Sequence, residues 1–301
     1  MNMRATFINT MLDMAEKDER VFLVTADMGF GVLEPYAKKF PNRFLNSGIT
    51  EQATVSMCGG LALSGYKVYC YSITPFVMMR CYEQVRLDAA YMNTDLKLIG
   101  VGAGFEYGVA GATHHAIEDI SLMRSLPNMQ VFCPGDNYEA EALLRETLMN
   151  DKPTYIRIGR NKEEFYYDDK PNIVMGKASV VEKGSRKAIL TTSNALSIGK
   201  RIVNDLKAKG ECPYLISFHT IKPFDVDMVK KLVDEGVEIY TVEENNIIGG
   251  LGSAVAEVIA EYGKASKFKR IGIPDEFTHK IGNQEFHRER YGFYQLGAQF
   301  K

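Results

Sequence analysis

The stretch NSGITEQATVSMCGGLAL, residues 46–63, places one carboxylate, Glu51, at the start of a segment that otherwise holds only small, apolar or uncharged polar residues. Residues 54–63 carry no charge, which predicts a helix that is buried on most of its sides. A carboxylate at the mouth of a buried helix costs free energy unless the protein uses it. We therefore expect Glu51 to have a chemical role.

Short runs of β-branched and aromatic residues flank this helix, as expected of buried parallel strands. In the first half of the chain the predicted strands cover residues 20–27, 67–72, 96–102, 129–134 and 153–160. After an N-terminal helix, the predicted helices cover residues 51–64, 79–92, 117–126 and 137–150. This alternation predicts a parallel sheet with helices on both faces, which is an α/β fold.

The second half of the chain repeats the alternation without repeating the sequence, so we predict a second α/β domain and no tandem repeat. Its predicted strands cover residues 187–193, 212–218, 238–245 and 270–274, and its predicted helices cover residues 194–209, 225–235 and 252–262. The periodicity is lost at residues 161–176, where we place a linker. We therefore predict two three-layer α/β/α domains, at residues 1–165 and 166–301.

The composition is typical of a soluble globular protein, since 46% of the 301 residues are hydrophobic and 25% are charged. A net charge of −2 argues against nucleic-acid binding. The five cysteines form no C-x-x-C pair, which favours free thiols in a reducing compartment. The sequence shows no signal peptide and no apolar run of the roughly 18 residues that cross a membrane. We predict a cytoplasmic protein that does not bind membranes.

Two glycine-rich stretches are candidates for phosphate binding, but neither spells G-x-G-x-x-G. GVGAGFEYG (100–108) follows a predicted strand, and GGLGS (249–253) precedes a predicted helix. Only the second could present a helix N-terminus to a phosphate. We expect close packing of a loop on a helix to explain both stretches.

GATHHAIED (111–119) concentrates polar side chains just before a predicted helix. Glu118 and Asp119 fall in the first helical turn, where acids favour the helix dipole. The adjacent His114 and His115 point in different directions and are poor ligands for one metal ion. From spacing alone, a pocket role for one of them stays open. Both this segment and Glu51 follow predicted strands, at the edge where open α/β sheets bind ligands.

Together these segments resemble the C-terminal half of transketolase, over essentially the whole chain. GITEQ (48–52) is similar to the family segment that carries the cofactor glutamate, and TPFVMMRCYEQVRLDAA (74–90) to the helix whose aromatic residues cover the cofactor's aminopyrimidine ring. The segment 111–136 resembles the family's D-G-P-T-H-Q loop and the strand after it. TVEENNIIGGLGSAVAEVI (241–259) and IGIPDEFTHKIG (271–282) resemble parts of the family's C-terminal domain.

The resemblance implies a thiamine-diphosphate pyrimidine-binding domain at residues 1–165 and a transketolase C-terminal domain at residues 166–301. It implies that Glu51 hydrogen-bonds the aminopyrimidine ring and stabilises its imino tautomer. An apolar setting suits this role, because burial raises a carboxyl pKa and favours sharing of the proton. The chemistry that follows belongs to the cofactor.

Further site residues carry over one at a time from the resemblance. Phe76 falls on the aromatic residue that stacks on the aminopyrimidine, Tyr82 on its neighbour, and Asp27 on an aspartate near the cofactor. His114 matches the histidine that contacts hydroxyls of the donor sugar. The remaining two, Arg4 and Arg160, fall where transketolases bind the sugar phosphate, although an ion pair at the surface or between domains is the alternative for both.

Three departures from the family pattern imply a specialised substrate. Ala110 replaces the aspartate that contacts the acceptor's α-hydroxyl, and Gly102 replaces a histidine near the phosphate. The E-E-H of the C-terminal domain reads EEN at 243–245. We therefore expect a specialised sugar, or its phosphate or nucleotide ester, in place of the usual pentose phosphates.

The chain also lacks the G-D-G…N motif with which the family holds the diphosphate and Mg²⁺; the nearest string is PGDN at 134–137. The resemblance therefore implies a partner, an N-terminal transketolase subunit that carries this motif and the metal. We predict an α2β2 heterotetramer with two shared sites. The alternatives are the β subunit of a 2-oxo acid dehydrogenase, half of an enzyme like deoxyxylulose-phosphate synthase, and a non-catalytic regulatory subunit.

Overall fold

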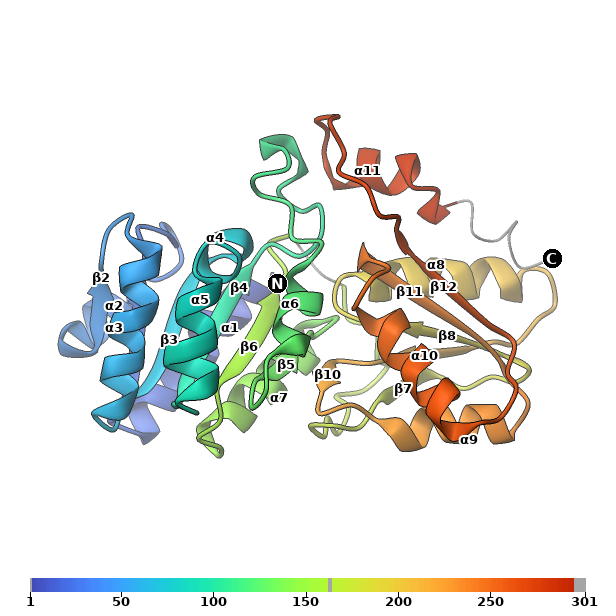
Figure 1. Cartoon of the computed structure of the whole chain (residues 1–301), viewed down its shortest axis with the longest axis horizontal. Coiled ribbons are helices and arrows are strands. Elements are labelled where there is room, and N and C mark those ends of the chain that lie inside the picture. Colours follow the sequence, from blue (N-terminus) through green and yellow to red (C-terminus); the bar gives the residue numbers. More distant parts are fainter. Residues whose placement is uncertain (1, 162–163, 295–301) are drawn as a thin grey trace.

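A computed structural model describes residues 2–161 and 164–294, which form two α/β units side by side (Figure 1). The first sheet has seven strands in the order β10-β5-β6-β4-β3-β1-β2. Its strands are β1 (Val21–Thr25), β2 (Phe44–Asn46), β3 (Lys67–Ile73), β4 (Leu96–Val101), β5 (Gln130–Phe132), β6 (Thr154–Ile158) and β10 (Thr220–Lys222). All neighbouring strands pair in parallel except β10, which is antiparallel to β5.

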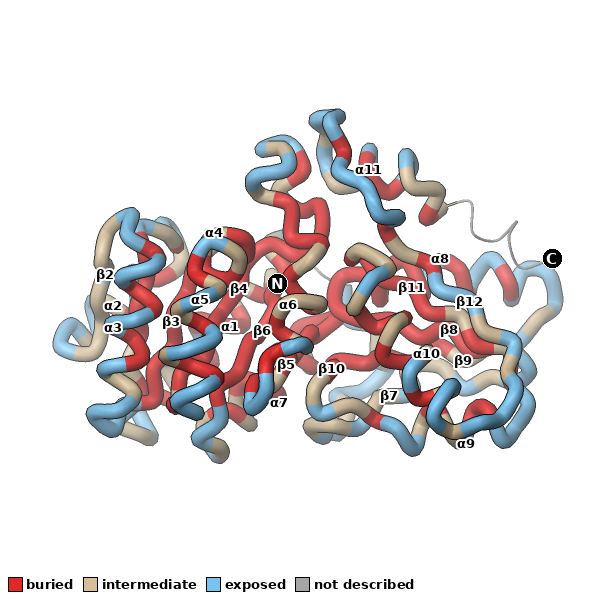
Figure 2. The backbone as a smooth tube through the Cα atoms, in the orientation of Figure 1, coloured by how far each residue is buried: buried red, intermediate tan, exposed pale blue. Residues whose placement is uncertain are grey.

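Helices cover both faces of this sheet, as the alternation predicts. One face carries α1 (Met3–Lys17), α2 (Glu34–Lys39) and α7 (Asn137–Leu148). The other carries α3 (Glu51–Leu63), α4 (Thr74–Met78), α5 (Tyr82–Gln84), the π-helix η2 (Val85–Tyr91) and α6 (Asp119–Ser125). Short 3₁₀ turns, η1 (Pro41–Arg43) and η3 (Gly108–Ala110), lie in the loops. Figure 2 shows the strands buried between helices whose outer faces are exposed.

The second sheet has five strands in the order β12-β11-β8-β9-β7. Its strands are β7 (Ser179–Glu182), β8 (Lys187–Thr191), β9 (Tyr214–Ser217), β11 (Glu238–Asn246) and β12 (Phe268–Ile273), and only β7 is antiparallel to its neighbour. Along β8 the side chains alternate, because Ile189 packs under α8 (Ala195–Lys207) while Ala188 and Leu190 face the other side. That side is covered by α9 (Val226–Asp234) and α10 (Leu251–Tyr262), and α11 (Gln284–Arg290) follows the sheet.

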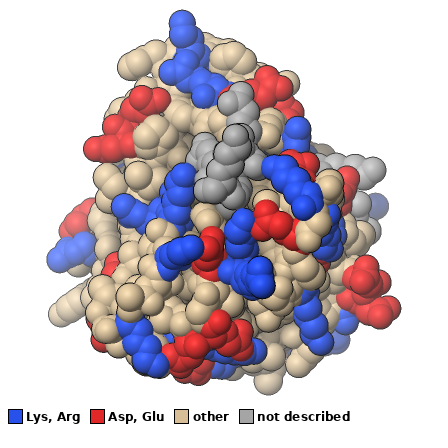
Figure 3. All heavy atoms as spheres, turned by 90° about the vertical axis from the view of Figure 1, so that its right-hand side faces the viewer, with Lys and Arg blue, Asp and Glu red and all other residues tan. Residues whose placement is uncertain are grey.

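Two features tie the units together. β10 comes from the second half of the chain but extends the first sheet, and the apolar core beneath α3 and α6 continues beneath α9 and α10. The sequence did not indicate β10, because three residues carry no period. The domain division at residue 165 stays a prediction. On the face of the second unit shown in Figure 3, Lys and Arg alternate with Asp and Glu.

The structure corrects two predictions about helices. The helix predicted at residues 79–92 begins at Thr74 and is broken into α4, α5 and the π-helix η2. The uncharged helix α3 is not buried on most sides: Val55 and Cys58 face the core, but Met57 and Leu63 are 37% and 60% exposed. Lack of charge on α3 therefore marks an uncovered apolar face.

Candidate active site

The predicted site lies at the carboxyl edge of the first sheet, where the chain leaves β1, β2, β3 and β4 (Figure 1). Glu51 opens α3 after β2, and α4 follows β3 directly. The loop after β4, residues 102–118, is called the histidine loop below; it projects from the sheet and contacts α11. This edge of a parallel sheet is where open α/β folds bind ligands.

Glu51 is not the isolated acid that the sequence predicts. Its Oε1 lies 2.9 Å from Nη1 of Arg80, just beyond α4. The Glu51 side chain is 6% exposed, whereas that of Arg80 is 48% exposed, so the pair is open to solvent on the arginine side. Within the described ranges, Oε2 of Glu51 accepts no hydrogen bond. Half of this carboxylate is therefore held, and half remains to bind something else.

Aromatic rings continue from this ion pair to the histidine loop. The guanidinium of Arg80 lies 4.5 Å from the ring centroid of Phe76. The Phe76 ring is half-buried and meets the His114 ring edge to face, with centroids 4.9 Å apart. Nδ1 of His114 is 2.9 Å from the hydroxyl of Thr113. Burial, and secondarily the charge of Arg80, lower the pKa of His114, so its imidazole is neutral at pH 7.

Tyr107 extends the same row toward the two predicted phosphate-binding arginines. Its ring centroid is 6.0 Å from that of His114 and 4.5 Å from the guanidinium of Arg160. Arg4 is also close enough for its charge to act on the Tyr107 hydroxyl. Neither arginine has an ion-pair partner among the residues that the structure describes. Of the two interpretations of the sequence, an anion site is thus better supported than an internal ion pair.

The other predicted residues lie at the margin of this group. Asp27 is exposed at the end of β1, with a φ of 51°, and its N–H donates to Oδ1 of Asn46 at 2.9 Å. Tyr82 packs against α6 and not beside the Phe76 ring. Its hydroxyl lies 3.0 Å from that of Ser125. His115 is buried, with its ring 4.9 Å from that of Phe105, which indicates a packing role.

Buried charges fix the histidine loop from beneath. Glu106 accepts hydrogen bonds from the backbone N–H groups of Ala103 and Arg160, and its burial raises its pKa. Arg157, fully buried on β6, donates to the carbonyl oxygens of Ala116 and Glu244 at 2.6 and 3.0 Å. The loop is therefore anchored both to its own sheet and to the second unit.

Two adjacent glutamates on β11 each contact one of the glycine-rich stretches. Glu243 accepts the N–H groups of Leu251 and Gly252 at 2.8 Å, so it occupies the N-terminus of α10 that a phosphate would need. Its burial raises its pKa to about 7. Glu244 lies against Gly104, where an added Cβ would come within 2.3 Å of its Oε1. Gly104 therefore makes room for a carboxylate on a strand, where the sequence predicts packing of the loop on a helix.

Glu244 forms a closed ion pair within the second unit and also accepts a hydrogen bond from the histidine loop of the first unit. Its Oε2 is 2.5 Å from Nε of Arg288 on α11, and the two side chains are 0% and 8% exposed. Its Oε1 accepts from the N–H of Phe105 at 2.7 Å and from Gln284 at 2.9 Å. Arg288 also donates to the carbonyl oxygen of Asn194. Residues of this chain therefore supply partners to both oxygens of the Glu244 carboxylate.

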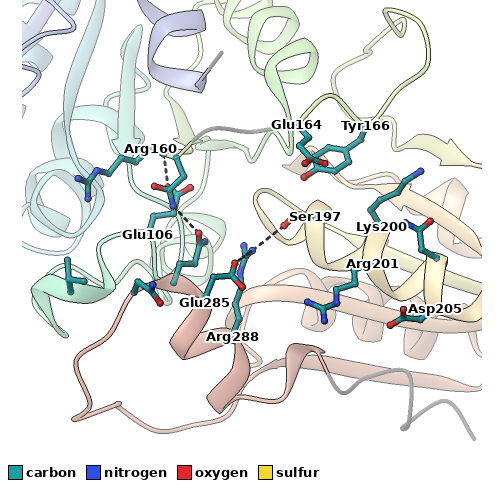
Figure 4. A pocket seen from close by; sticks show the side chains of 15 residues that line it. Glu106, Arg160, Glu164, Tyr166, Ser197, Lys200, Arg201, Asp205, Glu285 and Arg288 are labelled. Carbon is teal, nitrogen blue, oxygen red and sulfur yellow. Dashed lines mark hydrogen bonds and ion pairs between the residues drawn. The ribbon is translucent and has the colours of Figure 1, made fainter.

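A cavity of about 830 Å³ lies beyond this pair, between the first unit and α8 (Figure 4). It is lined mainly by polar side chains, including Glu106, Ser197, Lys200 and Arg201. Arg160 borders the cavity, but its guanidinium points away from Lys200 and Arg201. Glu51 does not line this cavity, which meets the row of side chains described above at Arg160.

The sequence reasoning missed Arg80 and Tyr107. Arg80 is four residues after Phe76, a spacing that places both on one side of a helix, and this was the available signal. No comparable signal marks Tyr107. Within residues 2–161 and 164–294, no group of three or more His, Cys, Asp or Glu side chains could hold a metal ion. None of the helices in these ranges combines the length and the apolar character that crossing a membrane requires.

Comparison with known proteins gives the family. The transketolase pyrimidine-binding domain matches residues 1–163, and the transketolase C-terminal domain matches residues 176–293. An apulose-4-phosphate transketolase subunit of Phocaeicola vulgatus is 34% identical, over 91% of this chain and 88% of that protein. A 6-deoxy-6-sulfo-D-fructose transketolase subunit of a Clostridium species is 30% identical, over 96% and 90%.

A solved structure agrees over nearly the whole length. A split-gene transketolase, described as an inactive β4 tetramer, has a TM-score of 0.88 and 26% identity and covers 99% of this chain and 97% of its own. The two-domain α/β architecture predicted from the sequence is confirmed. This chain belongs to the transketolase family, of which it carries the pyrimidine-binding and C-terminal domains.

Proposed function

We propose that this chain is one subunit of a thiamine-diphosphate-dependent transketolase, which transfers a two-carbon ketol unit from a ketose to an aldose. The observation that carries the proposal is the contiguous row of Glu51, Arg80, Phe76 and His114 at the carboxyl edge of the first sheet. Its relatives named for apulose-4-phosphate and for 6-deoxy-6-sulfo-D-fructose support a specialised sugar with an anionic end.

The side chains present fit the aminopyrimidine ring of thiamine diphosphate. Such a ring needs an aromatic surface and a carboxyl group that can share a proton with a ring nitrogen. Phe76 offers the surface, and Oε2 of Glu51 accepts no hydrogen bond within the described part of the chain. When bound, thiamine diphosphate supplies the carbanion chemistry that breaks and forms the carbon–carbon bond.

Each residue of this chain then has a defined task. Glu51 shares a proton with the ring through Oε2, while Arg80 holds Oε1 and fixes the orientation of the carboxylate. Phe76 covers the ring, and Asp27 lies on the cofactor side of the site. His114, neutral at pH 7, exchanges hydrogen bonds with hydroxyls of the donor sugar.

Arg4 and Arg160 bind the anionic end of the sugar. Both guanidinium groups lie without ion-pair partners within the described ranges, which is costly for two positive charges around one tyrosine unless an anion joins them. Tyr82 contributes indirectly, because its hydroxyl fixes α5 against α6 beneath the site.

A partner subunit supplies the rest of the cofactor site. This sequence lacks G-D-G, so the diphosphate and Mg²⁺ are held by a subunit that carries G-D-G…N. Two copies of each chain form an α2β2 heterotetramer, with the uncharged exposed face of α3 as a contact surface. The five free cysteines support a cytoplasmic location.

Reconstitution tests this proposal. The chain is co-expressed with a transketolase subunit that carries G-D-G…N, and ketol transfer is measured with phosphorylated and sulfonated ketoses as donors. We expect transfer that requires both chains, thiamine diphosphate and Mg²⁺. Decarboxylation of a 2-oxo acid by the complex, without ketol transfer, would contradict the assignment.

A further inference from the structure

Tyr107 occupies a space that a side chain at residue 102 would need. A Cβ atom built on Gly102 would lie 2.3 Å from Cδ2 of the Tyr107 ring, and Gly102 has a φ of 90°. The Tyr107 ring in this position therefore requires glycine at residue 102. The phenol of Tyr107 thus stands where the family resemblance places an imidazole near the sugar phosphate.

A shared buried carboxylate fixes Tyr107 and Arg160 relative to each other. Glu106, directly before Tyr107, accepts the N–H of Arg160 at 2.7 Å and that of Ala103 at 2.9 Å. The Arg160 guanidinium lies 4.5 Å from the Tyr107 ring centroid. On its other side, the Tyr107 ring is 6.0 Å from His114. Tyr107 therefore stands between the residues proposed to bind the sugar hydroxyls and the anionic end of the sugar.

A guanidinium that lies over an aromatic ring uses its flat face for that contact, and its N–H donors remain available in the plane. In-plane donors match two oxygens of one oxyanion. The guanidinium of Arg160 makes no ion pair or hydrogen bond with any residue that the structure describes, and it points away from Lys200 and Arg201 (Figure 4). Within the described ranges, its donors therefore remain available to a ligand.

We propose that Tyr107 is a specificity-determining residue, which presents Arg160 edge-on to a tetrahedral oxyanion, phosphate or sulfonate, at the end of the sugar remote from its carbonyl. This inference rests on the proposed transketolase function and names its substrate class. Because the phenol carries no charge, Arg160 and Arg4 supply the positive charge that attracts the anion.

Kinetics of the assembled enzyme test the inference with D-glyceraldehyde 3-phosphate and D-glyceraldehyde as a matched pair of acceptors. Tyr107→Leu removes the aromatic face and should lower kcat/KM about tenfold for the phosphorylated acceptor only, through KM, as loss of a cation–π contact permits. Tyr107→Phe should behave like the wild type. As a control, Tyr294→Leu removes a similar stack, with Arg201 at 4.1 Å, and should change neither value. Equal losses for both acceptors would overturn the inference.

Calorimetry on the full chain separates this inference from the proposed function. Inorganic phosphate should bind the wild type and Tyr107→Phe alike and bind Tyr107→Leu about tenfold more weakly. Titrations at pH 6 and pH 8 distinguish a phosphate from a sulfonate ligand. Phosphate gains negative charge over this range, whereas inorganic sulfate and methanesulfonate do not. Unchanged binding to Tyr107→Leu would refute the role of Tyr107, whereas absence of ketol transfer in the wild-type complex would refute only the function.

Discussion

Two glutamates of this chain each pair with an arginine, and the two pairs differ in how completely they are closed. Glu244 and Arg288 are 0% and 8% exposed, and Glu244 also accepts hydrogen bonds from Phe105 and Gln284. Glu51 is also buried, at 6% exposed, but Arg80 is 48% exposed and one carboxylate oxygen of Glu51 has no hydrogen bond from the described residues. Burial alone therefore does not distinguish the two carboxylates; their hydrogen-bond partners do, because those of Glu51 are incomplete and those of Glu244 are not.

The contrast between the two ion pairs would fail if the isolated chain already formed a complete cofactor site around Glu51. We expect the chain alone to show no ketol transfer and to bind thiamine diphosphate weakly, because the proposed function assigns the groups for the diphosphate and Mg²⁺ to a partner subunit. Light scattering and calorimetry on the isolated chain, and then on the co-purified pair, check this. Tight, Mg²⁺-dependent cofactor binding by the chain alone would show that no second polypeptide is needed.

Glu51→Gln tests the open pair directly. In the assembled enzyme it should lower turnover by roughly 100-fold or more, because an amide cannot share the proton. The melting temperature should change little, since Arg80 is already half in solvent. Glu83→Gln, an exposed acid beyond α4, is the matched control and should keep full activity. Activity above about a tenth of wild type for Glu51→Gln would argue against proton sharing.

Glu244→Gln tests the closed pair, and we expect it to act on stability. It should lower the free energy of unfolding by about 3 kcal/mol, because it leaves the charge of Arg288 buried and uncompensated. Glu285→Gln affects the same arginine from the solvent side, at 3.9 Å, and should cost at most about 0.5 kcal/mol. Urea denaturation of both variants measures the difference. Equal effects would mean that the closed pair adds no more than a surface contact.

His114→Ala sharpens the assignment within the open site. It should lower kcat/KM for the donor sugar about tenfold, through lost hydrogen bonds, while cofactor affinity stays nearly unchanged. The exposed His279 offers a control, since His279→Ala should alter neither quantity. Steady-state kinetics and cofactor titration give both values. A parallel loss of cofactor affinity in His114→Ala would place this ring on the cofactor instead of the sugar.

The fold could be predicted from the sequence wherever the residue pattern is local and long. The strands at 67–73 and 96–101 are rich in β-branched, aromatic and other apolar residues, and α3 begins at the predicted Glu51. β10 and α11 could not be found, because a three-residue strand and a short polar helix gain their stability from neighbours distant in sequence. The exposure of α3 was missed for a related reason: lack of charge looks the same in a core and in an interface.

The sequence predicted the acid of the site, Glu51, but not the residues that surround it. Glu51 stands out because its neighbours are uncharged, whereas Arg80 gains meaning only once Phe76 is known to lie one turn earlier. Tyr107 and Arg160 come from separate loops, so only the folded chain shows their contact. The ion pair between Glu244 and Arg288 is likewise a tertiary feature. The resemblance to a family placed residues by position, and the structure added which of them touch.

The position of β10 limits how this chain can be divided by evolution or in the laboratory. A gene cut between the predicted domains would remove the strand that covers β5, leaving an open sheet edge in the first product. The second product would keep a segment shaped to fit a sheet that it no longer possesses. We therefore expect the two halves to fold and to be exchanged as one piece, although each has a sheet of its own.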